Sequence, residues 1–137
     1  MDIDTLNALV TDAIWRAQEL DALGIQPASA WREVSVFEEE LAKALPSSEY
    51  EGQIARRGAV RSALKAGEYA RAQSLCETYL ADADAPTFLK TGVQEILEEA
   101  DREISSRFQH AAKHHTPREA RDLASRFSDA GAFSLAA

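Results

Sequence analysis

The sequence predicts an all-α fold, organised as one compact bundle of about six helices. Apolar residues recur at alternating three- and four-residue steps, which places them on one face of a helix. Glycine and proline separate these runs, and no segment alternates apolar and polar residues as a strand would. With 137 residues, of which 45% are hydrophobic, the chain is long enough for one domain with a buried core.

The first two predicted helices are bounded by glycine and proline. One covers about residues 4–23 and stops at Gly24. Its core stripe is Ile3, Leu6, Val10, Ala13, Ala17 and Leu20. The second opens at Pro27 and Ser29 and ends before Pro46, because proline cannot continue a helix. Its stripe is Ala30, Val34, Phe37, Leu41 and Leu45.

Two further helices form the middle of the chain and are joined at Gly67. Ser48 and Glu51 predict a capping box for the third helix, which ends near Ala66. One side of it is made of small residues, which lets another helix approach closely: Ala55, Ala59, Ser62, Ala63 and Ala66. The fourth helix carries Tyr69, Ala72, Cys76, Tyr79 and Leu80 on one side.

A long fifth helix is predicted over about residues 87–113. Its stripe is Leu89, Val93, Ile96, Ala100, Ile104, Phe108 and Ala111. A second capping box, from Thr116 to Glu119 with Pro117 at the first helical position, opens a sixth helix that ends at Gly131. These helices form one domain over residues 1–131, and residues 132–137 form a flexible tail.

The charge pattern limits the classes of partner. The net charge of −8 argues against nucleic acid, whose binding depends on neutralising phosphates. Most of this charge lies in residues 1–50, which carry ten acidic and three basic residues. Cys76 is the only cysteine, no apolar run approaches the roughly 20 residues that span a bilayer, and the N-terminus lacks a signal-peptide pattern. We therefore expect a cytoplasmic protein without a membrane partner.

Arg57, Arg61 and Lys65 form a basic stripe on the third helix, because they follow one another at four-residue steps. Most such charge runs are solvated faces, and ion pairs with the acidic first third are a second structural explanation. The functional alternative is a docking surface for an acidic segment of a partner, which the stripe would attract electrostatically.

The segment 53–86 resembles a single tetratricopeptide-type helical hairpin. The match rests on Gly67, Tyr69, Ala72 and Pro86. Arg56 stands where such a unit carries a large aromatic residue, and no second copy follows at a fixed period. The resemblance implies a helical interaction surface. An ordinary hairpin with a glycine C-cap is the alternative, and it is the more common one.

Trp15 lies on the side of the first helix opposite Leu6. A tryptophan on a polar helix side either contacts another part of the fold or is an exposed anchor for a partner. Internal contact is favoured, because large aromatic side chains are seldom left bare. We expect Trp31 to pack in the core.

Histidines suggest a second class of function. His110 and His114 are spaced i and i+4, as in some metal sites on one helix face. However, no Glu-x-x-His motif accompanies them, and Lys113 lies beside the pair. Positive side chains near a helix C-terminus complement the helix dipole, which explains them without a metal. The sequence shows no phosphate loop or nucleophile elbow, so we expect no enzyme activity and no cofactor.

The last three residues, Leu135, Ala136 and Ala137, resemble the end of the bacterial ssrA degradation tag, which the ClpXP protease recognises. In a bacterial source this resemblance implies a degradation signal, although three residues in an alanine-rich chain match easily by chance.

The sequence therefore predicts a small acidic protein-binding module: an adaptor, a chaperone, or an inhibitor of the immunity or antitoxin type. The candidate partner-binding residues are Arg57, Arg61, Lys65 and Trp15. The partner is another protein, with self-association as a further arrangement. The alternative is a metal-binding or enzymatic bundle that uses His110 and His114.

Overall fold

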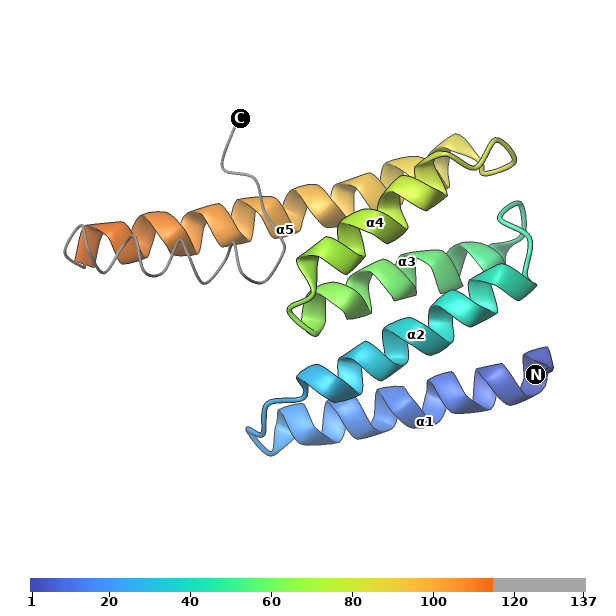
Figure 1. Cartoon of the computed structure of the whole chain (residues 1–137), viewed down its shortest axis with the longest axis horizontal. Helices are drawn as coiled ribbons and strands as arrows, with labels where there is room; N and C mark the ends of the chain where they lie inside the picture. The colour runs from blue at the N-terminus through green and yellow to red at the C-terminus, as the bar shows by residue number, and fades with distance from the viewer. Residues whose placement is uncertain (115–137) are drawn as a thin grey trace.

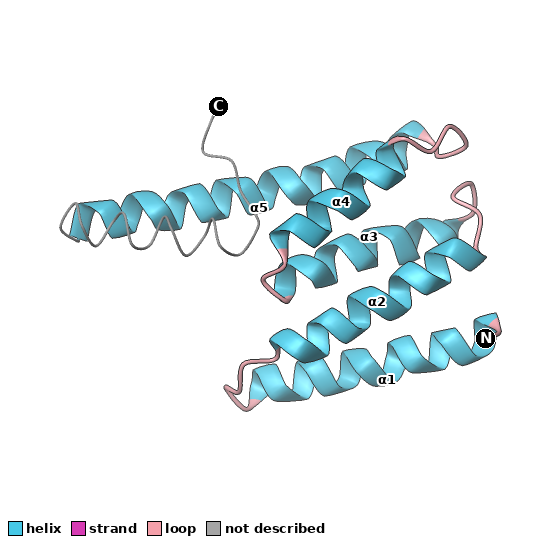
Figure 2. Ribbon diagram, in the orientation of Figure 1, coloured by secondary structure: helices cyan, strands magenta, loops and turns pink. Residues whose placement is uncertain are grey.

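The protein is a stack of antiparallel helices in which each helix lies beside the next one in the chain (Figure 1). The computed structural model describes residues 1–114, the last three of them by their place in a helix alone. Within this range the helices are α1 (Ile3–Ala22), α2 (Ala28–Ala44), α3 (Tyr50–Lys65), α4 (Tyr69–Leu80) and α5 (Thr87–His114). The described residues outside them are loops and turns, with no strand (Figure 2).

The all-α prediction is confirmed for these residues, and the five predicted helices that fall within them are present. The predicted sixth helix and the tail at 132–137 lie outside the described residues. The backbones of α1 and α3 do not approach each other, because α2 lies between them, whereas α3 contacts both α4 and α5. Figure 1 shows that α5 extends well beyond α3 and α4.

Two helices end in the glycine caps that the sequence predicts. Gly24 has a φ of 71° and Gly67 a φ of 75°, a region that L side chains rarely adopt. After α3, the amides of Gly67 and Glu68 donate to the carbonyls of Leu64 and Ala63 at 2.9 Å each. This pair of hydrogen bonds is a Schellman motif, and α1 ends in the same way at Gly24.

The predicted capping box at Ser48 and Glu51 is wrong. Helix α3 begins at Tyr50, and its N-cap Glu49 makes no side-chain capping hydrogen bond. Instead, the buried Arg56 side chain holds the α2–α3 connection. Its Nη1 donates to the carbonyl oxygen of Leu45 at 3.1 Å and to that of Gly52 at 2.8 Å.

Helix α3 packs closely against α2 through its small residues, as the sequence predicts. Ala59 and Ala63 are fully buried there. The Ser35 hydroxyl donates to the carbonyl of Ala59 at 2.7 Å, which places the α2 side chain directly on the α3 backbone. Arg71 of α4 donates to the same hydroxyl at 3.1 Å and pairs with Glu39 at 2.8 Å. These contacts set the register of α2 against α3.

The main core is formed by apolar residues from all five helices, and a second cluster joins α1 to α2. Trp31 and Cys76 are buried, as predicted. The Tyr69 hydroxyl donates to Asp101, which links the start of α4 to α5. No helix within residues 1–114 combines the length and apolar character needed to cross a membrane.

Candidate functional site: a basic groove over the second helix

The basic stripe of α3 forms one wall of a groove of about 340 Å³. Ile14 and Gln18 of α1 line the opposite wall, and Trp31 and Glu38 of α2 lie between the two walls. The groove exists because α2 lies between α1 and α3, so that α1 and α3 stand apart from each other over α2. We call this feature the basic groove.

The three basic residues are brought together, but none of them forms an ion pair with any carboxylate among the described residues. The Lys65 ammonium lies 4.2 Å from the centre of the Trp31 ring, and the Arg57 guanidinium lies 5.7 Å from that of Phe88. The Nε of Arg57 is buried without a hydrogen-bond partner. The stripe thus makes no direct ion pair with the acidic first third, although Arg61 and Lys65 interact electrostatically with Glu38 at longer range, and solvation and partner docking both remain.

Trp31 gives the Lys65 side chain a fixed platform. The Trp31 residue is 5% exposed, and its Nε1 donates to Asp21 of α1 at 3.3 Å. A cation over the face of an indole ring is attracted by the ring quadrupole. Lys65 is thus held against the groove, while the residue itself remains exposed.

Glu38 is the residue that the sequence analysis missed. It is 8% exposed, and its Oε2 is buried without a hydrogen-bond partner. Burial raises the pKa of this carboxyl to about 7, although Arg61 and Lys65 act in the opposite direction. The signal was present, because Glu38 stands four residues after Val34 and three before Leu41, in register with the α2 core stripe.

Gly58 makes room for this carboxyl. A Cβ atom at position 58 would lie 1.4 Å from the Glu38 Oε2, so any side chain there would displace the glutamate. Helix α3 thus presents backbone, and not a side chain, to the Glu38 carboxyl.

Trp15 is 69% exposed, so the favoured prediction of an internal contact is wrong and the exposed-anchor alternative remains. It follows Ile14, which lines the groove, and lies about 60° around the helix from Gln18 at about 100° per residue. Ile54, at 44% exposed, lines the groove from α3. Exposed apolar side chains therefore lie on or beside both walls of the basic groove.

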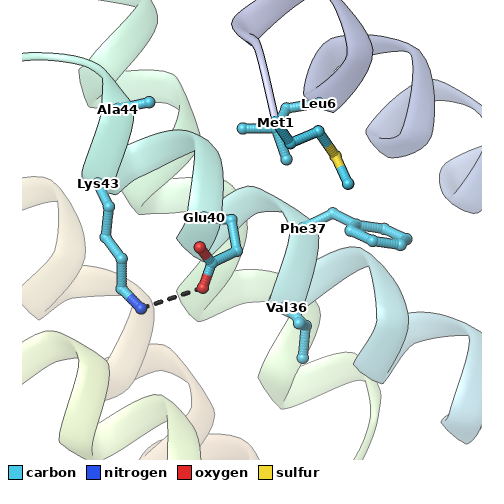
Figure 3. A pocket seen from close by; sticks show the side chains of 7 residues that line it. All are labelled: Met1, Leu6, Val36, Phe37, Glu40, Lys43 and Ala44. Atoms are coloured by element: carbon cyan, nitrogen blue, oxygen red, sulfur yellow. Dashed lines mark hydrogen bonds and ion pairs between the residues drawn. The ribbon is translucent and has the colours of Figure 1, made fainter.

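A second groove, of about 380 Å³, lies between the start of α1 and the end of α2 (Figure 3). Met1 and Phe37 point toward each other across it, and Val36 lies at its edge. The charged residues in its lining, Glu40 and Lys43, pair with each other at 3.1 Å. Because its charged side chains pair with each other, it is the weaker candidate for recognition.

The described residues add no support for the alternative of a metal site at His110 and His114. His110 is exposed on α5, whereas the side chains of His114 and of the degradation-signal residues Leu135, Ala136 and Ala137 lie outside the described residues. Within the described part of the chain, no three His, Cys, Asp or Glu residues are grouped so that they could hold a metal ion. Cys76 is 1% exposed, and burial raises the pKa of its thiol, which disfavours a nucleophilic thiolate.

Comparison of the chain with protein-family models, with curated proteins and with solved structures gave no significant match.

Proposed function

We propose that this chain is a cytoplasmic protein–protein interaction module without catalytic activity, which binds an acidic segment of another protein in the basic groove. Three cations without carboxylate partners on one wall of a groove are the observation that carries this proposal. Most other described cations of the chain have a partner of opposite charge. The paired basic residues are Arg16, Arg32, Lys43, Arg71 and Arg107.

A basic groove is unusual on this chain, because the chain as a whole is acidic, with a net charge of −8. An acidic partner segment is repelled by most of this surface and attracted by the basic groove, so the charge distribution favours binding at one place. The exposed apolar residues beside the groove would contact apolar residues of the same segment. Cys76 is a free, buried thiol, which fits a reducing compartment such as the cytoplasm.

The resemblance of the α3–α4 hairpin to a tetratricopeptide unit belongs to the same proposal. Its support is the Gly67 cap and the burial of Tyr69 and Ala72 between α3, α4 and α5. A hairpin of this kind would act here as the scaffold that holds the basic wall of the groove.

Reversing the basic stripe is expected to abolish binding of an acidic probe. A terminally blocked hexaglutamate peptide should bind the wild-type protein, and the variant Arg57→Glu, Arg61→Glu, Lys65→Glu should bind it at least about tenfold more weakly. Each replaced cation becomes a like charge beside the ligand, and like-charge contacts cost several kcal/mol in total. Isothermal titration calorimetry at about 0.15 M salt measures the change, because distant charges are screened there.

The matched control is Arg32→Glu, Lys43→Glu, Arg107→Glu, which changes the net charge equally at three exposed positions outside the groove. It should bind hexaglutamate nearly as well as the wild type. Equal weakening in the two triple variants would reject the groove as the binding site. A dimer in sedimentation velocity that only the groove variant disrupts would identify a second copy of this chain as the occupant and overturn the proposal of a different partner.

Replacing Trp15 tests its role as an anchor. The Trp15→Ala variant should change the free energy of unfolding by less than about 0.5 kcal/mol, because the side chain is mostly exposed. It should leave hexaglutamate binding unchanged but weaken binding of the peptide Glu-Glu-Leu-Glu-Glu-Leu several-fold, since Trp15 offers only apolar contact area. Equal affinity of the two proteins for the leucine-containing peptide would exclude Trp15 from the binding surface.

A further inference from the structure

The floor of the basic groove holds a carboxyl group with an unused oxygen. Glu38 lies in the groove lining, is more than nine-tenths buried, and its Oε2 has no hydrogen-bond partner. This oxygen lies against the Gly58 backbone of α3 and is closed off in the contact between α2 and α3. The Glu38 carboxyl, which is part of the groove lining, therefore meets the groove through its other oxygen, Oε1.

The packing of the hydrophobic core does not explain why a glutamate is buried at position 38. A buried carboxylate is normally paired or hydrogen-bonded, because taking its charge out of water is costly. Arg61 and Lys65 lower the energy of its charged form, yet neither lies within ion-pair distance of it. Desolvation by burial is larger than the effect of these two cations, and it raises the pKa of the Glu38 carboxyl to about 7. In the free protein near neutral pH, protonated and ionised forms are therefore both populated.

The surroundings decide what kind of ligand group can meet this carboxyl. The charged and titratable groups that line the groove with Glu38 or interact with it electrostatically are Arg57, Arg61, Lys65 and Tyr79. Helix α1 contributes only the uncharged Ile14 and Gln18 to the lining. A cationic ligand group would be repelled by the three cations of α3. An anionic ligand group is attracted by these three cations, but it would lie beside the Glu38 carboxyl. Two adjacent carboxyl groups cannot both be ionised, so one of them must carry a proton.

We infer that one carboxylate of the acidic partner segment binds against Glu38 at the floor of the basic groove and accepts a hydrogen bond from its protonated carboxyl. This inference rests on the proposed function and names the contact that selects a carboxylate at that site. The proton comes from solvent, and no covalent bond forms or breaks. The cations of α3 stabilise the charge that the pair retains. A hydrogen bond between a carboxylic acid and a carboxylate is charge-assisted and stronger than a neutral one.

Binding must then be linked to the protonation of Glu38. With a free-state pKa of about 7, roughly nine-tenths of the free protein is protonated at pH 6 and roughly one-tenth at pH 8. Since the complex requires the protonated form, wild-type affinity for an acidic ligand should fall about tenfold between pH 6 and pH 8. Each binding event at pH 8 should take up close to one proton.

Isothermal titration calorimetry with terminally blocked hexaglutamate tests whether binding is linked to the protonation of Glu38. Titrations at pH 6 and pH 8, each in two buffers of different ionisation enthalpy, give both the affinity and the number of protons taken up. The Glu38→Gln variant keeps the shape of the side chain and an N–H donor but cannot ionise. It should bind with about the same affinity at both pH values and take up no extra proton. The control Glu40→Gln, at an exposed position of the same helix, should behave as the wild type does.

The outcomes separate this inference from the proposed function. If Glu38→Gln loses the same tenfold as the wild type, the inference is wrong, while groove binding stands. If the wild type binds hexaglutamate at neither pH, the proposed function fails as well. Should Glu38→Gln not fold, the Glu38 carboxyl carbon can be followed by NMR in the wild type. Its titration midpoint should rise when hexaglutamate is added, and an unchanged midpoint would overturn the inference.

Discussion

Replacing Gly52 with alanine should destabilise the protein by about 3 kcal/mol, the upper part of the range for overpacking. A Cβ atom at this position would lie 2.0 Å from the carbonyl oxygen of Pro46 and 2.8 Å from its carbonyl carbon. Both are backbone atoms, so no side-chain rotation can relieve the overlap. The α2–α3 connection would have to shift, and with it the hydrogen bonds of Arg56 to the Leu45 and Gly52 carbonyls. Urea unfolding followed by circular dichroism measures the loss.

Gly92→Ala is the matched control for this substitution. The added Cβ at position 92 would meet only the Arg57 Cδ, at 3.4 Å, which is ordinary van der Waals contact. Alanine is favoured over glycine inside a helix by about 1 kcal/mol, so this variant should be stabilised. The two glycine-to-alanine changes should therefore have opposite signs. A Gly52→Ala variant as stable as the wild type would show that α2 and α3 are not joined as closely as described.

Replacing Glu38 with glutamine should change how stability depends on pH. The folded pKa of about 7 lies above the reference value of 4.5, so the folded state binds more protons than the unfolded state between these values. The free energy of unfolding contributed by Glu38 is therefore fully present below about pH 4.5 and is lost as pH rises to about 7. Since one pKa unit corresponds to about 1.4 kcal/mol, the loss is of the order of 3 kcal/mol.

The Glu38→Gln variant cannot undergo this loss. Its stability relative to the wild type should rise by about 2.5 kcal/mol between pH 5 and pH 8, whatever constant difference the amide itself introduces. All other titratable groups are common to both proteins, so the comparison isolates the contribution of residue 38. Urea unfolding at four or five pH values gives the profile, with Glu40→Gln as the control that should follow the wild type. A pH-independent difference between Glu38→Gln and the wild type would mean that Glu38 is solvated in the folded protein.

The stability cost of Glu38 has a direct bearing on function. A carboxyl that destabilises the free fold at neutral pH and could be compensated by a ligand is typical of a binding group, because functional sites often break the rules that core packing obeys. Gly58 supports the same interpretation, because the lack of a side chain at this position of α3 leaves room for the Glu38 carboxyl.

Much of the fold could be predicted because helices are local structures. Their hydrogen bonds join residues four apart, so the spacing of apolar residues and the glycine stops at Gly24 and Gly67 indicate where they run. The long α5 agrees with its predicted range to within one residue at either end. The capping box at Ser48 was wrong because α3 begins at Tyr50, and the Arg56 side chain holds the α2–α3 connection by a hydrogen bond to the Leu45 carbonyl.

The candidate site was predicted in part. The spacing of Arg57, Arg61 and Lys65 placed them on one face, and they line one groove. Trp15 was expected to make an internal contact because large aromatic side chains are usually covered, yet among the described helices only α2 contacts α1 and Trp15 is 69% exposed. Glu38 was missed because a glutamate within an acidic run normally faces water.

The spacing of residues along the chain indicates which of them share a helix and a helix face, including the basic stripe and the small-residue side of α3. What each face meets depends on how the helices pack: α2 lies between α1 and α3, Trp31 lies under Lys65, and the Glu38 carboxyl is buried beside Gly58. The physical reason is that helix formation depends on neighbours in the chain, whereas burial and charge pairing depend on the register between helices, which long-range packing sets.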